Sequence, residues 1–435
     1  MGDEPPSPGT RADFLTRDAS ADELRHACVL NHVDWTRRLA AASDGDCGVD
    51  GDLFLAHLPK PRPELHIVVL DVHGDRLRAQ VDEAVRSARG LGVERVGCWL
   101  TSADEQTQVG GWVGARGFRP GGLPQWMALD LRGVAIDGQS AEAVSPVERL
   151  RDWSVCGLTA FDGETAAIRD AMGAVEPRRV WHLALWGDGG PVGQIAVTAT
   201  TGPWGVAGLH DLIILPEARS QGIGAARFRA LCRFVADLGA RYVVLNAEGN
   251  PPALYRMLGF RSIGRGKTWW LSGDALATEH TADRVTLAEA IGAGELATLA
   301  RFRDRLGDRL PNGMTTVEFA AATAQQASAR WLVDNGAPLD VLSAWDLGWQ
   351  DAVRGLLADS TVRDRQRPRS GKSILHTAVE RDDPDLARVA LASGVDVELR
   401  DNRFDATALD WAKALQRPRM VAVLSPATTG DQGVS

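Results

Sequence analysis

The chain has 435 residues, a length that predicts about three domains at roughly 150 residues per domain. Hydrophobic residues make up 44% and charged residues 24%, as in ordinary globular proteins, and the formal net charge of −9 disfavours nonspecific binding to nucleic acid or to anionic membranes. The sequence contains no apolar run of about 20 residues that would span a membrane, and its acidic N-terminus lacks the apolar core of a secretory signal.

The cysteines favour a cytoplasmic protein with reduced thiols. Their number is odd, they are widely scattered, and no CxxC pair occurs, so neither a disulfide framework nor a zinc site is expected. We therefore expect no metal. The five residues are Cys28, Cys47, Cys98, Cys156 and Cys232.

The first part of the chain is expected to contain a disordered arm over 1–20 and a folded segment over 21–132. Apolar periodicity predicts helices over 76–91 and 104–115. Strands are predicted over 65–70, 93–100 and 126–131. Residues 133–144 are rich in Gly, Asp, Ser and Gln, which is typical of a linker.

The second segment, 145–272, alternates predicted strands and helices. A strong helix is predicted over 222–238, because apolar residues recur along one face and Gly239 follows. A short helix is predicted over 252–258. The predicted strands run over 180–186, 192–199, 208–215, 242–246 and 268–271.

The third segment, 285–426, is helical in pattern and contains a repeat. Ala344, Ala378 and Ala412 are spaced 34 residues apart, and each ends a similar group of four residues. A period of 33–34 residues predicts stacked units of two helices.

One stretch carries a pattern with chemical meaning. A strand ending at Pro216 runs into a loop with Arg219, Gly222 and Gly224, and the loop opens the helix. The N–H groups and the positive dipole end of a helix N-terminus suit a diphosphate, and glycines let the backbone approach it closely. A Tyr-x-x-x-Gly-Phe motif, Tyr255 to Phe260, follows after a further strand.

These motifs, in this order, resemble the GNAT superfamily of N-acetyltransferases over residues 145–272. The resemblance implies a mixed α/β (α+β) fold with a central mixed sheet, and acetyl-CoA as a co-substrate. It implies that the backbone of Leu212, Ile213 and Ile214 pairs with the pantetheine arm. The pyrophosphate would be cradled by Ser220, Gln221, Gly222, Ile223, Gly224 and Ala225, with Arg219 positioning the loop.

The resemblance also implies direct attack by a primary amine on the thioester. Tyr255 would protonate the departing thiolate, since its ordinary pKa is near that of a thiol. His210 is the leading candidate for the general base, and by strand alternation it shares a face with Leu212 and Ile214. Asp211 and Glu248 are alternatives. Glu248 also stands where many members have an asparagine that contacts the cofactor, so that contact is in doubt.

Both flanking segments carry further resemblances. Residues 112–131 are similar to the end of a GNAT domain, but the first segment lacks the phosphate-binding loop and has Asp71 and Asp75 there. It is therefore interpreted as a degenerate GNAT half that serves as a scaffold or as a wall of the acceptor site. The third segment, best at 371–402, resembles an all-α ankyrin-repeat solenoid, which implies either a protein partner or a merely stabilising appendage.

Two functions stay open. The first is acetyl transfer to an amine, whose carrier is a small molecule, an amino-acid derivative or a protein. The second is a CoA-binding adaptor without catalysis that acts through its repeats. Neither nucleic acid nor membrane is expected as a partner.

Overall fold

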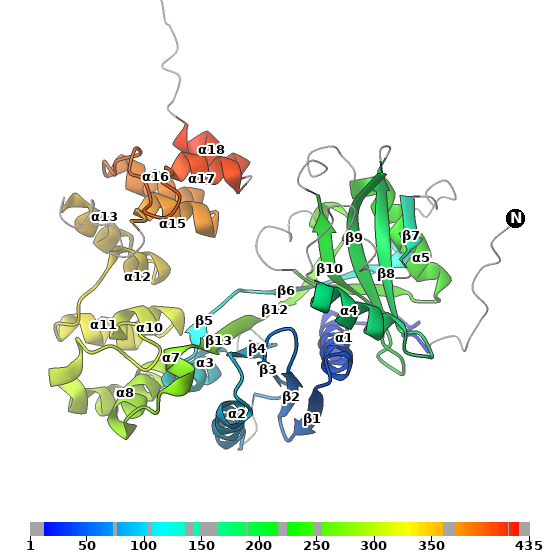
Figure 1. Ribbon diagram of the computed structural model, residues 1–435. Helices are drawn as coiled ribbons and strands as arrows, with labels where there is room; N and C mark the ends of the chain where they lie inside the picture. Colours follow the sequence, from blue (N-terminus) through cyan, green and yellow to red (C-terminus); the bar gives the residue numbers. More distant parts are fainter. Residues whose placement is uncertain are drawn as a thin grey trace, which may run out of the picture. The chain divides into compact units, whose positions relative to one another are not determined.

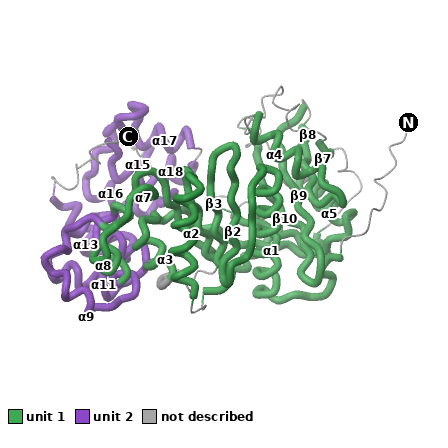
Figure 2. Tube along the Cα trace, turned by 60° about the horizontal axis from the view of Figure 1, so that its bottom comes forward, with its two compact units in different colours: residues 1–289, 310–313 green, residues 290–309, 314–435 purple. Residues whose placement is uncertain are grey.

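The computed structural model describes residues 13–72, 76–101, 106–134, 143–147, 163–187, 190–215, 224–247, 255–359, 371–415 and 417–425. The chain forms two compact units, residues 1–289 with 310–313 and residues 290–309 with 314–435 (Figure 2). Within the described ranges, no helix has the length and apolar character needed to cross a membrane.

The first unit contains two mixed sheets. The first sheet has the strand order β1-β2-β3-β4-β13-β5. Its strands are β1 (Asp46–Asp50), β2 (Leu53–Leu58), β3 (Glu64–Val69), β4 (Arg95–Leu100), β5 (Arg119–Pro120) and β13 (Lys267–Ser272). Helix α2 (Leu77–Leu91) connects the parallel pair β3 and β4, and α3 (Gln106–Ala115) follows β4.

The second sheet has the order β12-β6-β11-β10-β9-β8-β7. Its strands are β6 (Gln125–Asp130), β7 (Val144–Pro146), β8 (Val180–Gly187), β9 (Gly190–Ala199), β10 (Ala207–Ile214), β11 (Tyr242–Ala247) and β12 (Arg261–Arg265). Helix α5 (Gly224–Asp237) connects the parallel pair β10 and β11. Short helical segments lie at η1 (Leu131–Gly133) and α7 (Asp274–Ala277).

The two sheets exchange one strand each (Figure 1). Strand β6 comes from the first segment but pairs with β11 and β12 in the second sheet, whereas β13 comes from the second segment and pairs with β4 in the first. Each exchanged strand carries a fully buried tryptophan, Trp126 on β6 and Trp269 on β13. The ranges 21–132 and 145–272 are therefore segments of sequence that do not correspond to separate sheets.

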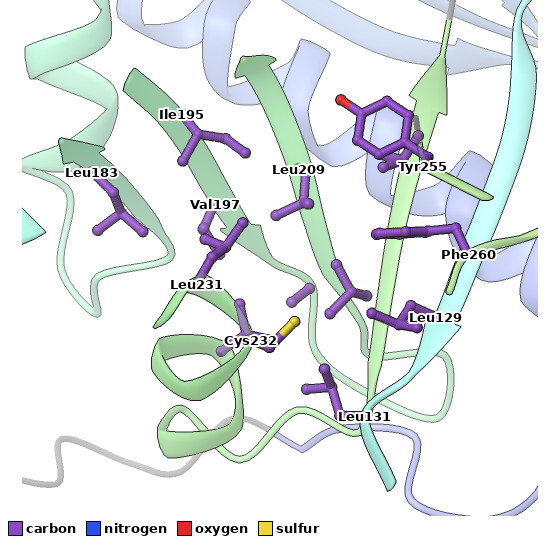
Figure 3. Packing of buried hydrophobic residues seen from close by; sticks show 14 of the residues in the cluster. Leu129, Leu131, Leu183, Ile195, Val197, Leu209, Leu231, Cys232, Tyr255 and Phe260 are labelled. Carbon is purple, nitrogen blue, oxygen red and sulfur yellow. The ribbon is translucent and has the colours of Figure 1, made fainter. Parts of the chain in front are cut away.

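Helices cover both faces of the second sheet. Helix α1 (Ala21–Ala42) begins at a capping box formed by Ser20 and Glu23, and it packs with α4 (Gly163–Gly173) on one face. Helix α5 packs on the other face, where its residues Leu231 and Val235 join a cluster of buried side chains. Figure 3 shows Leu231 among them. We call these the α1 face and the α5 face.

The start of the described chain differs from the expectation of a disordered arm over 1–20. Residues 13–20 lie against the fold, because Leu15 is buried and its N–H donates to the carbonyl of Gly205 at 2.8 Å. An apolar residue within a polar stretch gave too weak a local signal to predict this packing.

The second unit is helical. Helices α12, α15 and α17 begin after N-caps at Asp340, Ser373 and Thr407, so the caps repeat at the predicted period. Ala344, Ala378 and Ala412 are fully buried in the second unit, where a small side chain lets helices approach closely. The helices of this part of the chain are α8 (Ala282–Ala293, shared with the first unit), α9 (Leu296–Leu299), η5 (Ala300–Arg305), α10 (Thr316–Ala322), α11 (Gln326–Asp334), α12 (Val341–Asp346), α13 (Gln350–Ala358), α15 (Ile374–Arg381), α16 (Pro384–Ala392), α17 (Ala408–Ala414) and α18 (Pro418–Leu424).

Candidate active site

The two parallel strands β10 and β11 pair only along part of their length. The paired residues run from Ala207 opposite Val243 to Leu209 opposite Leu245, although β10 continues to Ile214 and β11 to Ala247. Beyond Leu209 the edge of β10 that faces β11 makes no strand pairing among the described residues. An extended ligand can pair with a strand edge of this kind.

A β-bulge at Asp211 accompanies the opening. Against β9, His210 stands opposite Ala196 and Ile213 opposite Gln194, so two residues of β10 face one residue of β9. Asp211 has a φ of 50°, in the left-handed region that aspartate tolerates better than most residues. The buried Arg169 of α4 holds its carboxylate, with 2.8 Å between Nε and Oδ2.

The bulge reverses the side-chain alternation of β10. Strand alternation predicted that His210 shares a face with Leu212 and Ile214, and this is wrong. His210 contacts α1, whereas Leu212 and Ile214 pack against the hydrophobic cluster on the α5 face. The extra residue at the bulge moves every later side chain to the opposite face.

His210 is held tightly on the α1 face. Its ring stacks on Trp35 with 4.3 Å between centroids and 2° between planes, and its Nε2 lies 3.0 Å from the Oδ1 of Asn31. Burial, followed by the nearby His32 and Arg169, lowers the pKa of His210 well below its usual range. The imidazole is therefore neutral near pH 7 and able to accept a proton.

Tyr255 lies on the α5 face, in the helical turn that precedes Gly259 and Phe260. Its ring packs edge to face on Phe260 at 5.5 Å between centroids. Figure 3 shows the hydroxyl directed toward the strand that carries Leu209. Burial raises the pKa of Tyr255 to about 12, so the phenol keeps its proton at physiological pH.

Four further residues around the opening are not predicted from the sequence: Asn31 and Trp35 on α1, Arg169 on α4, and Asn246 near the end of β11. Asn246 Oδ1 is buried without a hydrogen-bond partner among the described residues. Asn31 and Trp35 lie four residues apart, which puts them on one helix face, but nothing in the sequence indicates which strand they contact. Only the packing of α1 on the second sheet brings them to His210.

Several predicted residues lie outside the described part of the chain: Arg219, Ser220, Gln221, Gly222, Ile223 and Glu248. Helix α5 starts at Gly224, two residues after the predicted start, and the side chain of Ala225 is likewise outside the description. Asp211, an alternative base, is engaged by Arg169. No cluster of three or more His, Cys, Asp or Glu side chains in the described ranges is arranged to hold a metal ion.

Comparison with known proteins finds one family match, over the range that contains these residues. Residues 147–260 match the model of the acetyltransferase (GNAT) family. No curated protein matches the sequence. The matched range contains both strands of the opening, the bulge and Tyr255.

Among solved structures, the chain is similar to a GCN5-related N-acetyltransferase from Kribbella flavida, with 18% identity and a TM-score of 0.42 over 58% of this chain and 97% of that one. A tandem GNAT protein from the clavulanic acid biosynthesis pathway is similar at 18% identity and a TM-score of 0.38, covering 53% and 79%. The ankyrin repeat domain of Bcl-3 matches at 21% identity and a TM-score of 0.27, covering 32% and 68%.

Proposed function

We propose that the protein transfers an acetyl group from acetyl-CoA to a primary amine at the opening between β10 and β11. The observation that carries the proposal is this opening, which lies inside the range that matches the acetyltransferase family. Such a reaction needs a strand edge that a ligand can join, a neutral histidine and a protonated tyrosine. Among the described residues β11 leaves the edge of β10 beyond Leu209 without strand pairing, and the histidine and the tyrosine lie on opposite faces.

Acetyl-CoA would bind as an added strand. Its pantetheine arm carries amides that suit the edge of β10 at Leu212, Ile213 and Ile214, beyond the point where β11 pairs with this strand. Its pyrophosphate would lie at the N-terminus of α5, held by the N–H groups of residues 220–225, with Arg219 positioning the loop. The thioester then lies where β10 and β11 separate.

The two faces of the sheet would divide the proton transfers. The amine nitrogen attacks the thioester carbonyl carbon from the α1 face, and its proton passes to the imidazole of His210. The C–S bond breaks, and the thiolate takes the phenolic proton of Tyr255 on the α5 face. These steps leave His210 protonated and Tyr255 deprotonated, and exchange of one proton with water at each residue restores both. No covalent intermediate forms on the protein, and the products are an N-acetylated amine and CoA.

The helical repeats of the second unit are proposed to bind a partner, as ankyrin repeats do. Their regular caps and buried alanines support a repeat architecture, which presents an extended surface. Under this proposal the repeats recruit the acceptor or a regulator to the enzyme.

The test is release of CoA thiol from acetyl-CoA by the purified full chain with spermidine, kanamycin, tyramine and a lysine-containing peptide as acceptors. Amine-dependent thiol release, together with an acetylated product by mass spectrometry, supports the enzyme. Acetyl-CoA binding without turnover on any amine would favour the adaptor. Absence of acetyl-CoA binding would overturn both.

A further inference from the structure

Asn31, on the N-terminal helix α1, makes two hydrogen bonds that fix the direction of its amide. Its Nδ2 donates to the backbone carbonyl of Thr198 at 3.1 Å. A carbonyl only accepts, so the amide nitrogen must face Thr198, and Oδ1 must face the Nε2 of His210, 3.0 Å away.

This direction determines which nitrogen of His210 carries the proton. Asn31 Oδ1 has no proton to give, so the hydrogen bond requires Nε2–H as the donor. A neutral imidazole has one N–H, and Nδ1 is then the nitrogen with a free lone pair. None of the described residues donates a hydrogen bond to this Nδ1.

Close packing holds the Asn31 side chain in place. Asn31 is 1% exposed, and a Cβ on Gly208 would lie 1.7 Å from its Oδ1. Gly208 and His210 are two residues apart on β10, before the bulge, so they share the α1 face. The stack on Trp35 sets the plane of the imidazole. The first segment thereby orients a side chain of the second.

We propose that Asn31 is a positioning residue that holds His210 in the Nε2–H form, so that Nδ1 serves as the base toward the acceptor amine. The inference rests on the proposed function for the role of Nδ1. The hydrogen bond itself can be tested without any acetyl transfer.

The direct experiment is long-range ¹H–¹⁵N NMR of the full chain labelled with ¹⁵N-histidine. The chain has nine histidines, and His210→Gln assigns the signal of His210. We expect the Nε2–H form alone at pH 7 in the wild type. Asn31→Asp keeps an acceptor and adds a negative charge to a site that His32, Arg169 and Asp211 already face, so the pKa of His210 should rise. An Nδ1–H form, or a pKa that Asn31→Asp leaves unchanged, would overturn the proposal.

The kinetic experiment uses the most active amine of the panel. Asn31→Leu, close in size but without the acceptor, should lower kcat by about 10- to 100-fold, as part of the loss expected on removing a general base. In a His210→Gln background the same change should have no further effect, because the contact has no imidazole to orient. Equal effects in both backgrounds would make Asn31 merely structural and overturn the proposal.

A second variant disrupts the contact between Asn31 and His210 by a substitution on strand β10. Gly208→Ala should displace Asn31 and reproduce the loss of kcat seen in Asn31→Leu. Gly48→Ala is the matched control, because a Cβ there on strand β1 meets nothing within 4 Å. A wild-type rate in His210→Gln would show that His210 takes no part in the reaction. The hydrogen bond seen by NMR would then have no catalytic role. This outcome would overturn the proposal about Asn31 but not the proposed acetyl transfer.

Discussion

Each of the two sheets contains one pair of parallel strands connected by a helix, but the two pairs differ in how far their strands stay hydrogen-bonded. In the first sheet, β3 and β4 pair in parallel along their whole length, from Glu64 opposite Arg95 to Val69 opposite Leu100. In the second, β10 and β11 pair over three residues and then separate. A parallel pair that is hydrogen-bonded along its whole length leaves no strand edge for a ligand, so of these two junctions only the one between β10 and β11 opens among the described residues.

The ends of the two segments show the same contrast. In both, a glycine with positive φ ends a helix, and the N–H of the next phenylalanine bonds back five residues, from Phe118 to the carbonyl of Val113 and from Phe260 to that of Tyr255. The local structure is thus shared, and the residue whose carbonyl accepts this bond is a buried tyrosine in one segment and a buried valine in the other.

The largest effect is expected on deleting residues 1–132. If the two segments were independent domains, the rest of the chain would still bind acetyl-CoA. The deletion removes β6, which pairs on both edges inside the second sheet, together with α1. We expect no cooperative thermal unfolding and no binding of acetyl-CoA by calorimetry.

Its control is co-expression of residues 1–132 as a separate chain, which should restore folding and binding by supplying β6 and α1. A deletion variant that folds alone and binds acetyl-CoA as the full chain does would show that the strand exchange is unnecessary for the site.

The next effect concerns the glycines before and at the start of α5. Replacing Gly222 and Gly224 by valine should abolish acetyl-CoA binding, because Cβ groups would block the approach of the backbone to the pyrophosphate. The control is Gly90→Ala in helix α2, which connects β3 and β4, because a Cβ at Gly90 meets nothing within 4 Å. It should leave the affinity for acetyl-CoA, measured by calorimetry, unchanged. Unchanged affinity in the folded valine variant would remove this loop from the site.

A smaller effect is expected for Tyr255→Phe, which keeps the ring packing and deletes the proton donor. kcat should fall about 10- to 10⁴-fold, as expected for loss of a general acid, with little change in acetyl-CoA affinity. Tyr242→Phe is a matched control, since Tyr242 is the chain's other tyrosine and its hydroxyl donates to the backbone of Arg17. Wild-type turnover in Tyr255→Phe, with chemistry rate-limiting, would make Tyr255 a packing residue.

Local elements could be predicted from the sequence because their signals are local. The helix expected over 222–238 is observed as Gly224–Asp237, and the strand expected over 242–246 as Tyr242–Ala247. Both carry a clear apolar period with glycine or polar residues at their ends.

Strand partners and the faces of the site could not be predicted in this way. The apolar character of residues 126–131 and 268–271 predicts two strands, but it does not indicate which sheet each strand joins. The bulge at Asp211 has no glycine to signal its positive φ, so strand alternation alone wrongly predicts that His210 shares a face with Leu212 and Ile214. Both errors concern interactions between residues far apart in the sequence.

The most direct test of the central claim, a single acetyl-CoA site at the junction of β10 and β11, is the stoichiometry of binding. Isothermal titration of the full chain with acetyl-CoA should give one molecule per chain, and the valine variant at Gly222 and Gly224 should give no binding. Two molecules per chain, or one that survives the valine substitutions, would show that the junction of β3 and β4 or another part of the molecule binds the cofactor.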